Sequence, residues 1–282
     1  MFSRKREGSV VCPNCGRLVG VNDARCFNCG ARNPSLFGFA PALSRLGADF
    51  GFSKLILGAC AVLYVISLVL SRGQLGASGG LFGLLAPNTA VLVLLGSSGA
   101  YPVFHYGRWW TVLSAGWLHA GLLHIGFNML WVRDIAPGVA RLYGAGRMML
   151  IYLIAGVGGF FLTSVMGLIL PGVPLLGGAS LTLGASASLF GLFGALICYS
   201  QRTGQTGMRR MIWGWVLIGL VFGVVVPHVD NWAHVGGFVT GWVTARILDP
   251  LREERPIHVL GALAGLLLSF AAIVVSVVTA LG

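Results

Sequence analysis

Long apolar stretches separated by short polar connections dominate the chain from residue 54 to its end. Seven of them have about the 17 to 25 residues that a helix needs to cross the hydrocarbon core of a bilayer. A further apolar segment, Leu81–Gly96, is interrupted by Pro87 and Asn88, so we expect it to lie in the interface or to re-enter. The predicted spans are Lys54–Ser71, Leu113–Val132, Met148–Leu170, Gly184–Ser200, Met211–Val226, Ala233–Leu248 and His258–Leu281.

The composition agrees with this pattern. Of the 282 residues, 56% are hydrophobic and 10% are charged, which excludes a water-soluble globular protein of ordinary composition. The sequence therefore predicts an all-α polytopic membrane protein that lies in the lipid bilayer.

The net charge of +11 would fit a nucleic-acid-binding protein, but the positions of the basic residues argue against one. Most of the basic residues that follow the start of the first span lie in alternate connections between spans. The positive-inside rule therefore predicts a cytoplasmic N-terminus and, after seven spans, a C-terminus outside. The start, Met1–Val11, has no apolar core typical of a signal peptide. Eight of the 19 basic residues precede or open the first span: Arg4, Lys5, Arg6, Arg17, Arg25, Arg32, Arg45 and Lys54.

Two CxxC pairs near the N-terminus form the strongest metal-binding pattern in the chain. Four thiolates from two tight turns match tetrahedral zinc, and a glycine follows each pair. Disulfides are the alternative, but thiols on the cytoplasmic side stay reduced. We therefore expect a structural Zn²⁺ ribbon that binds a cytoplasmic protein partner or regulates, because four cysteines leave no open position for catalysis. The expected ligands are Cys12, Cys15, Cys26 and Cys29.

The start of the fourth span places a hydroxyl between small residues. Gly184 and its neighbours let other backbone approach Ser186, and the following helix begins with N–H groups that have no intrahelical partner. Taken alone, this stretch is more typical of helix packing. His234, however, opens the sixth span at the same membrane depth, on a face that carries Gly237 and Gly241. If the two helices are neighbours, the imidazole reaches the hydroxyl.

Phe190 lies one turn below Ser186, where it could pack on that imidazole and fix its orientation. The second span carries further polar residues that are expensive in lipid. His124 and Asn128 share one face of a helix, whereas His119 falls on the opposite face. The three therefore do not form one metal site. Either they tie helices together, or His124 and Asn128 are hydrogen-bond donors that face one point.

These motifs together resemble those of the rhomboid family of intramembrane serine proteases, over about Lys54–Leu248. The resemblance implies a six-helix catalytic core, to which this chain adds a seventh transmembrane helix and the ribbon. With the cysteine pattern and the apolar runs outside this core, the sequence predicts six segments: 1–9 basic tail, 10–33 zinc ribbon, 34–53 linker, 54–248 catalytic core, 249–257 cytoplasmic loop and 258–282 seventh helix. The shared residues are Gly184 and Ser186 with Phe190, the HxxxxHxxxN set His119, His124 and Asn128, and the AHxxGxxxG set His234, Gly237 and Gly241.

The family resemblance also implies a mechanism. Ser186 is expected to be the nucleophile and His234 the general base and acid, without a catalytic acid residue. His124, Asn128 and the backbone of Ser186 would form the oxyanion hole, with His119 in support. The expected substrates are membrane proteins with helix-weak transmembrane segments, cut near the outer face of a prokaryotic inner (cell) membrane.

Two positions depart from the family pattern. Ala187 stands where glycine commonly follows the nucleophile, and Trp110-Thr111 replaces a Trp-Arg pair, with Arg108 displaced upstream. Asp230, one turn before His234, could orient the imidazole or could cap the helix. The alternative function is a non-catalytic protein that binds transmembrane helices and uses the ribbon for docking.

Overall fold

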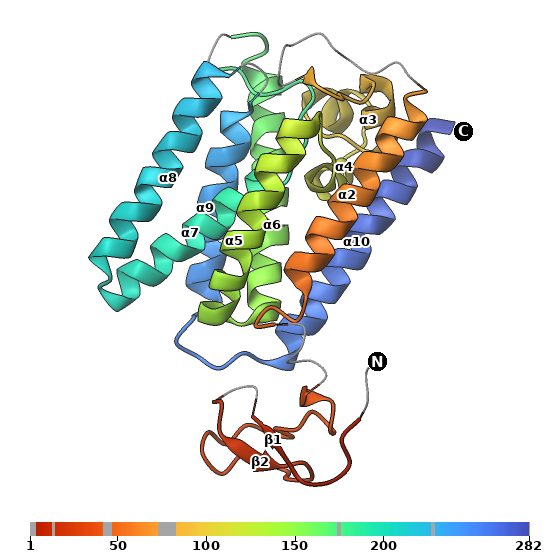
Figure 1. Ribbon diagram of the computed structural model, residues 1–282. Helices are drawn as coiled ribbons and strands as arrows, with labels where there is room; N and C mark the ends of the chain where they lie inside the picture. Colours follow the sequence, from red (N-terminus) through yellow and green to blue (C-terminus); the bar gives the residue numbers. More distant parts are fainter. Residues whose placement is uncertain are drawn as a thin grey trace. The chain divides into compact units, whose positions relative to one another are not determined.

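The computed structural model describes residues 4–12, 15–41, 47–72, 83–173, 176–226 and 229–281. It divides the chain into two compact units, Met1–Phe52 and Ser53–Gly282 (Figure 1). Residues 42–46 of the predicted linker and the first two residues of the predicted interfacial segment Leu81–Gly96 lie outside the described residues.

The first unit is built around a short hairpin. Strand β1 (Ser9–Val11) pairs antiparallel with β2 (Leu18–Gly20), with Val10 opposite Val19. Each of these two valines points inward, because side chains alternate between the faces of a strand. The core that they begin is small, so bound metal would add much of its stability. Its buried members are Val10, Cys12, Val19, Val21 and Cys26.

The second unit is a bundle of helices. Among those that the structure describes, α2, α6, α8 and α10 are long and apolar enough to cross a membrane. This confirms an all-α polytopic membrane protein. The helices α5, α7 and α9 run between them and carry more polar and small residues. The seven long helices are α2 (Phe52–Leu70), α5 (Leu122–Tyr143), α6 (Ala145–Ile169), α7 (Ser186–Thr203), α8 (Thr206–Val225), α9 (Asn231–Ile247) and α10 (Pro256–Leu281).

Helix α7 is the centre of the bundle. Every side chain from Ala187 to Cys198 is buried, which requires neighbours on all sides of the helix. Helices α6 and α9 make the most extensive contacts with it. Helix α8, at the edge of the bundle in Figure 1, buries Ile212 and Val216 and leaves most of its surface exposed. The nucleophile candidate therefore starts the most enclosed helix, beside the least enclosed one.

Glycines allow α7 and α9 to meet. Gly237 and Gly241 of α9 lie so close to Ala187 and Gly191 of α7 that a Cβ on either glycine would overlap the backbone of α7. Small residues at such spacing are what close helix packing in a membrane requires. The glycine ridge that the sequence predicts on the sixth span thus faces the fourth span.

The second predicted span, Leu113–Val132, is wrong in its boundaries. The structure has two short turns, α4 (Thr111–Ser114) and η3 (Ala115–Trp117), and the backbone is extended at Leu118 before α5 begins. The N–H of Ala120 donates to Nδ1 of His124 instead of to a carbonyl of the preceding turn. Local apolar composition could not reveal this break, because side chains on both sides of it are buried.

The connection between α2 and α5 contains α3 (Thr89–Leu95) and the π-helical turn η2 (Tyr101–His105). A helix of seven residues is about 10 Å long and cannot cross a bilayer. Asn88, which interrupts the apolar segment in the sequence, caps α3 by accepting a hydrogen bond from the N–H of Ala90. We refer to residues 83–117 as the first loop.

Candidate active site

Ser186 and His234 meet at the same end of the bundle. Ser186 is the first residue of α7, and His234 lies in the first turn of α9. The Nε2 atom of His234 lies 3.0 Å from the Oγ atom of Ser186, which is hydrogen-bond distance. Phe190 stacks on the imidazole with ring centroids 4.1 Å apart and planes 4° apart. The ring of His234 is therefore held between a hydroxyl and an aromatic face.

The other ring nitrogen of His234 has no partner in the part of the chain that the structure describes. Asp230 instead caps α9, because its Oδ1 atom accepts hydrogen bonds from the N–H of Ala233 and from the hydroxyl of Thr163. Of the two roles considered for Asp230, the geometry favours the cap. Ser186 and His234 are then a pair without a third, acidic member.

His124 faces the same end of α7 from α5. The N–H of Ala120 donates to its Nδ1 atom, so a neutral ring carries its proton on Nε2. A Cβ on Gly184 would lie 2.6 Å from that Nε2 atom, and the φ angle of Gly184 is +122°. Only glycine tolerates both conditions. His124 thus presents a donor against the backbone just before Ser186.

Asn128 lies one turn after His124, is 5% exposed, and donates from Nδ2 to the carbonyl oxygen of His124. His119 is 1% exposed and packs the edge of its ring against His124, with centroids 5.1 Å apart. His119 precedes α5, so the prediction that it lies on the opposite face of one helix does not apply. His119 restricts the orientation of the His124 ring, while Asn128 and His124 share a face as predicted.

Ala187 fits where the family commonly has glycine. It is fully buried, and a Cβ on Gly159 of α6 would lie 2.8 Å from the Cβ of Ala187. The absence of a side chain at Gly159 therefore provides the space that the alanine methyl group occupies. The sequence analysis missed this residue, although the run of glycines at 156, 158 and 159 was a signal for close packing on α6.

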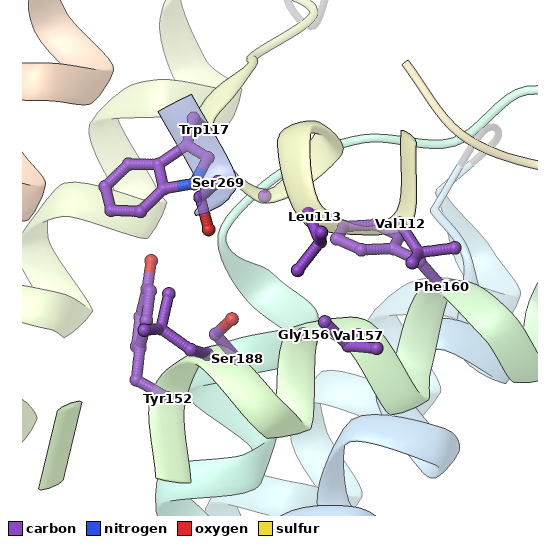
Figure 2. Close-up of a pocket in the computed structure, with 11 residues that line it drawn as sticks. Val112, Leu113, Trp117, Tyr152, Gly156, Val157, Phe160, Ser188 and Ser269 are labelled. Carbon is purple, nitrogen blue, oxygen red and sulfur yellow. The ribbon is translucent and has the colours of Figure 1, made fainter. Parts of the chain in front are cut away.

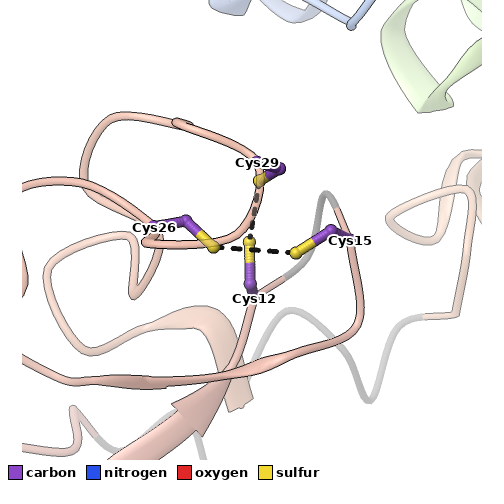
Figure 3. A group of neighbouring side chains, drawn as sticks. All are labelled: Cys12, Cys15, Cys26 and Cys29. Carbon is purple, nitrogen blue, oxygen red and sulfur yellow. Dashed lines mark hydrogen bonds between the residues drawn. The ribbon is translucent and has the colours of Figure 1, made fainter.

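The four cysteines of the first unit form a candidate metal centre (Figure 3). Their sulfur atoms all lie within 4.8 Å of one another. None of the four forms a disulfide: the sulfur atoms of Cys12 and Cys29 are 3.9 Å apart and those of Cys15 and Cys26 are 3.6 Å apart, far longer than a disulfide bond of about 2 Å. A hydrogen bond from the backbone of Arg17 lowers the pKa of Cys15 to about 6, which favours the thiolate that binds metal.

The chain matches proteins of one family. The family model of the Rhomboid domain matches residues 106–250, just over half of the chain. Rhomboid protease GluP of Bacillus subtilis is 33% identical over 57% of this chain and 30% of its own length. RHOMBOID-like protein 2 of Arabidopsis thaliana is 34% identical, over 58% and 50%.

Rhomboid-like protease 3 of Toxoplasma gondii is 28% identical over 69% of this chain and 68% of its own length. The chain spans half or less of the length of the Bacillus and Arabidopsis relatives. The matched residues 106–250 include the pair at Ser186 and His234 as well as His124 and Asn128. By this match and by its motifs, the chain belongs to the rhomboid family.

Proposed function

We propose that this protein is an intramembrane serine endopeptidase that cuts transmembrane segments of other membrane proteins near the outer face of the bilayer. The observation that carries the proposal is the 3.0 Å contact between Ser186 Oγ and His234 Nε2, with Phe190 stacked on the imidazole. A hydroxyl becomes a nucleophile when an adjacent base accepts its proton. Two of the similar proteins, those of Bacillus subtilis and Toxoplasma gondii, are named as proteases, which supports a protease function.

In the proposed reaction, Nε2 of His234 takes the proton from Ser186 as Oγ attacks a peptide carbonyl carbon. The tetrahedral intermediate collapses when His234 gives this proton to the leaving amine, which breaks the C–N bond and leaves an acyl ester on Ser186. Water, deprotonated by His234, then hydrolyses the ester and regenerates the hydroxyl. The pair needs no acid residue, because Phe190 holds the ring.

The negative charge on the carbonyl oxygen needs donors at the same point. The N–H of Ser186 opens α7 and has no intrahelical acceptor, and the positive end of the helix dipole lies there. The proposed further donors are the Nε2–H of His124 and the amide of Asn128, both on α5. Each such donor contributes on the order of 3 kcal/mol to lowering the barrier.

A substrate helix must enter from the bilayer, and α8 is the wall that best permits this. Two of its side chains are buried, whereas α7 is enclosed over Ala187–Cys198. Trp215 of α8 contacts the rings of Trp131 and Phe193. A helical peptide bond is shielded from attack, so residues with low helix propensity near the outer end of the substrate favour cleavage.

We further propose an orientation and a location. The distribution of basic residues supports an N-terminal unit in the cytoplasm and a C-terminus outside. The proposed location is a prokaryotic inner membrane. The active site then opens to the outer side. Alkaline phosphatase is active only outside the cytoplasm. A fusion of this enzyme after the last residue should therefore be active if the proposed orientation is correct.

The metal of the first unit is proposed to be Zn²⁺ in a structural role. With zinc–sulfur bonds of about 2.3 Å, the edges of a tetrahedron are about 3.8 Å long. The sulfur separations of 3.6 and 3.9 Å agree with that length. Such an ion orders the unit and leaves its surface for a cytoplasmic protein partner.

The proposed protease function is tested by labelling the protein in membranes with a fluorophosphonate probe that reacts with active serines. The wild type should be labelled, and Ser186→Ala and His234→Ala should lose labelling. Ser200→Ala is the matched control, because it removes a buried hydroxyl from the other end of α7, where it donates to the carbonyl of Ile197. Equal labelling of wild type and Ser186→Ala in folded protein would favour the alternative, a non-catalytic helix-binding protein.

A further inference from the structure

Helix α10 presents one buried face to the rest of the second unit. Its buried side chains recur every three or four residues, which makes a continuous stripe on one side of a helix. Leu267, on another side, is 72% exposed. The stripe faces α6 and also α3 and α4, two short helices of the first loop. Its members are Ala262, Leu266, Ser269, Ala272, Ile273 and Ser276.

Ser276, near the carboxyl end of α10, accepts two hydrogen bonds from the first loop. The indole N–H of Trp110 donates to its Oγ at 3.0 Å, and Nη2 of Arg108 donates to its backbone oxygen at 2.7 Å. Nη1 of Arg108 donates to the carbonyl of Val93 in the last turn of α3. The positive charge of Arg108 lies near the carboxyl ends of two helices, where the negative end of each helix dipole stabilises a cation. A Cβ on Gly96 would lie 2.6 Å from Ser276 Oγ, so the loop also packs directly on α10.

Inside the first loop, hydroxyl groups connect this anchor to the segment after α3. The hydroxyl of Ser114 donates to the carbonyl of Gly96 at 2.7 Å, and the hydroxyl of Thr111 lies 3.3 Å from that of Ser98. All three hydroxyl-bearing residues are buried. Buried polar groups with satisfied partners fix one arrangement of the backbone around them.

The same loop then pairs with the segment that leads to the nucleophile. Ser98 and Thr182 exchange two backbone hydrogen bonds, at 2.9 and 2.8 Å. The N–H of Gly184 donates to the carbonyl of Ala115 at 3.0 Å. Gly184 stands two residues before Ser186, so the first loop sets the path of the backbone that enters the active site.

A second contact joins α10 to the core about two turns deeper. Figure 2 shows a small cavity lined by Ser269 of α10, Trp117, Tyr152 of α6 and Ser188 of α7. Its volume of about 10 Å³ is close to the space of one water molecule. Ser188 lies two residues after Ser186, so α10 and the nucleophile helix line the same cavity.

We propose that α10 is a positioning element of the active site, which acts through the anchor of Arg108 and Trp110 on Ser276 and through the first loop. This proposal rests on the proposed protease function. It assigns a role to the displaced arginine: where the family has arginine after Trp110, this chain has Thr111, and Arg108 reaches α10 instead. Ser276, Arg108 and Trp110 touch no reacting atom and are positioning residues.

Five variants and one control test the anchor in the full chain in membranes. Ser276→Ala and Trp110→Phe each remove one side of the same hydrogen bond, so each should lower kcat about fivefold. Their double variant should be no worse than either single one. Arg108→Ala should lower kcat by about tenfold or more, and Arg108→Lys should recover part of it, because an ammonium can still donate to one carbonyl. Leu267→Ala is the control: it truncates an α10 side chain that is 72% exposed and lies on another side of the helix.

Two readouts separate the outcomes. Hydrogen exchange at the amides of Ser98 and Thr182 should accelerate in Ser276→Ala and Arg108→Ala and stay unchanged in Leu267→Ala. Unchanged exchange and unchanged kcat in folded Ser276→Ala and Arg108→Ala would overturn the proposal. If the exchange effect appears but even the wild type fails to label with the serine probe, the proposed protease function fails and the structural coupling stands.

Discussion

Phe190 lies flat on the imidazole of His234, with the two rings 4.1 Å apart and within 4° of parallel. Phe190 belongs to α7 and His234 to α9, the two helices that glycines allow to pack closely. In the proposed mechanism the stacked ring restrains the orientation of the histidine, a role that a carboxylate bonded to Nδ1 has in a three-membered serine protease site.

Removing this ring should therefore lower activity without unfolding the bundle. Phe190→Ala should reduce kcat about tenfold, because an aromatic contact of this kind contributes about 0.5 to 1.5 kcal/mol. Phe190→Tyr keeps the ring and should retain most of the activity. Steady-state cleavage of a transmembrane substrate measures both; equal kcat for Phe190→Ala and wild type would contradict the role.

The backbone before the nucleophile should be intolerant of a side chain at Gly184. Gly184→Ala adds a Cβ at the position of the His124 ring and strains a φ of +122°, so we expect probe labelling to fall at least about hundredfold. Gly172→Ala is the matched control, because Gly172 also has a positive φ, +70°, but no atom within 4 Å of its Cβ position. Similar losses in both variants would show that strain alone, and not His124, is responsible.

The proposed oxyanion donors should act on the transition state more than on substrate binding. Asn128→Ala should lower kcat by about a hundredfold and change KM little, because the donor bonds a charge that develops during the reaction. His124→Ala should give a similar loss. A rise in KM at unchanged kcat would instead assign these residues to substrate binding.

Asp230 should matter for stability and not for the protonation of His234. Asp230→Ala removes the cap of α9 and should reduce the free energy of unfolding by about 1 kcal/mol. The pH dependence of kcat should keep its midpoint. Asp230→Ala with a shifted midpoint would mean that the carboxylate acts on the histidine.

Acidification should release the metal from the first unit. The pKa of Cys15 is lowered to about 6, so its thiolate persists above that pH and is lost as the pH falls through it. Protons then compete with the ion for the sulfur, and metal content should fall as the pH is lowered. Elemental analysis after dialysis at pH 7.5 and 5 measures this, with the double variant Cys12→Ser, Cys15→Ser as the metal-free reference. Retention of the ion at pH 5 would contradict the expectation.

The sequence alone determined the membrane class and the cysteine cluster. It also predicted that Ser186 and His234 would meet, whereas its boundaries for the second span were wrong. These follow from local signals: the length of apolar runs, residue spacing and motifs. Periodicity even predicted that the glycines of the sixth span would face a neighbouring helix.

Only the tertiary structure decided where α5 begins, why Ala187 fits and what holds the first loop. His124 ends the preceding turn by accepting from Ala120, Gly159 makes room for a methyl group from another helix, and Ser276 binds residues more than 160 positions earlier. Each depends on groups that are distant in the chain and adjacent in space. Local hydrophobicity records that a side chain is buried, but it does not record which partner buries it.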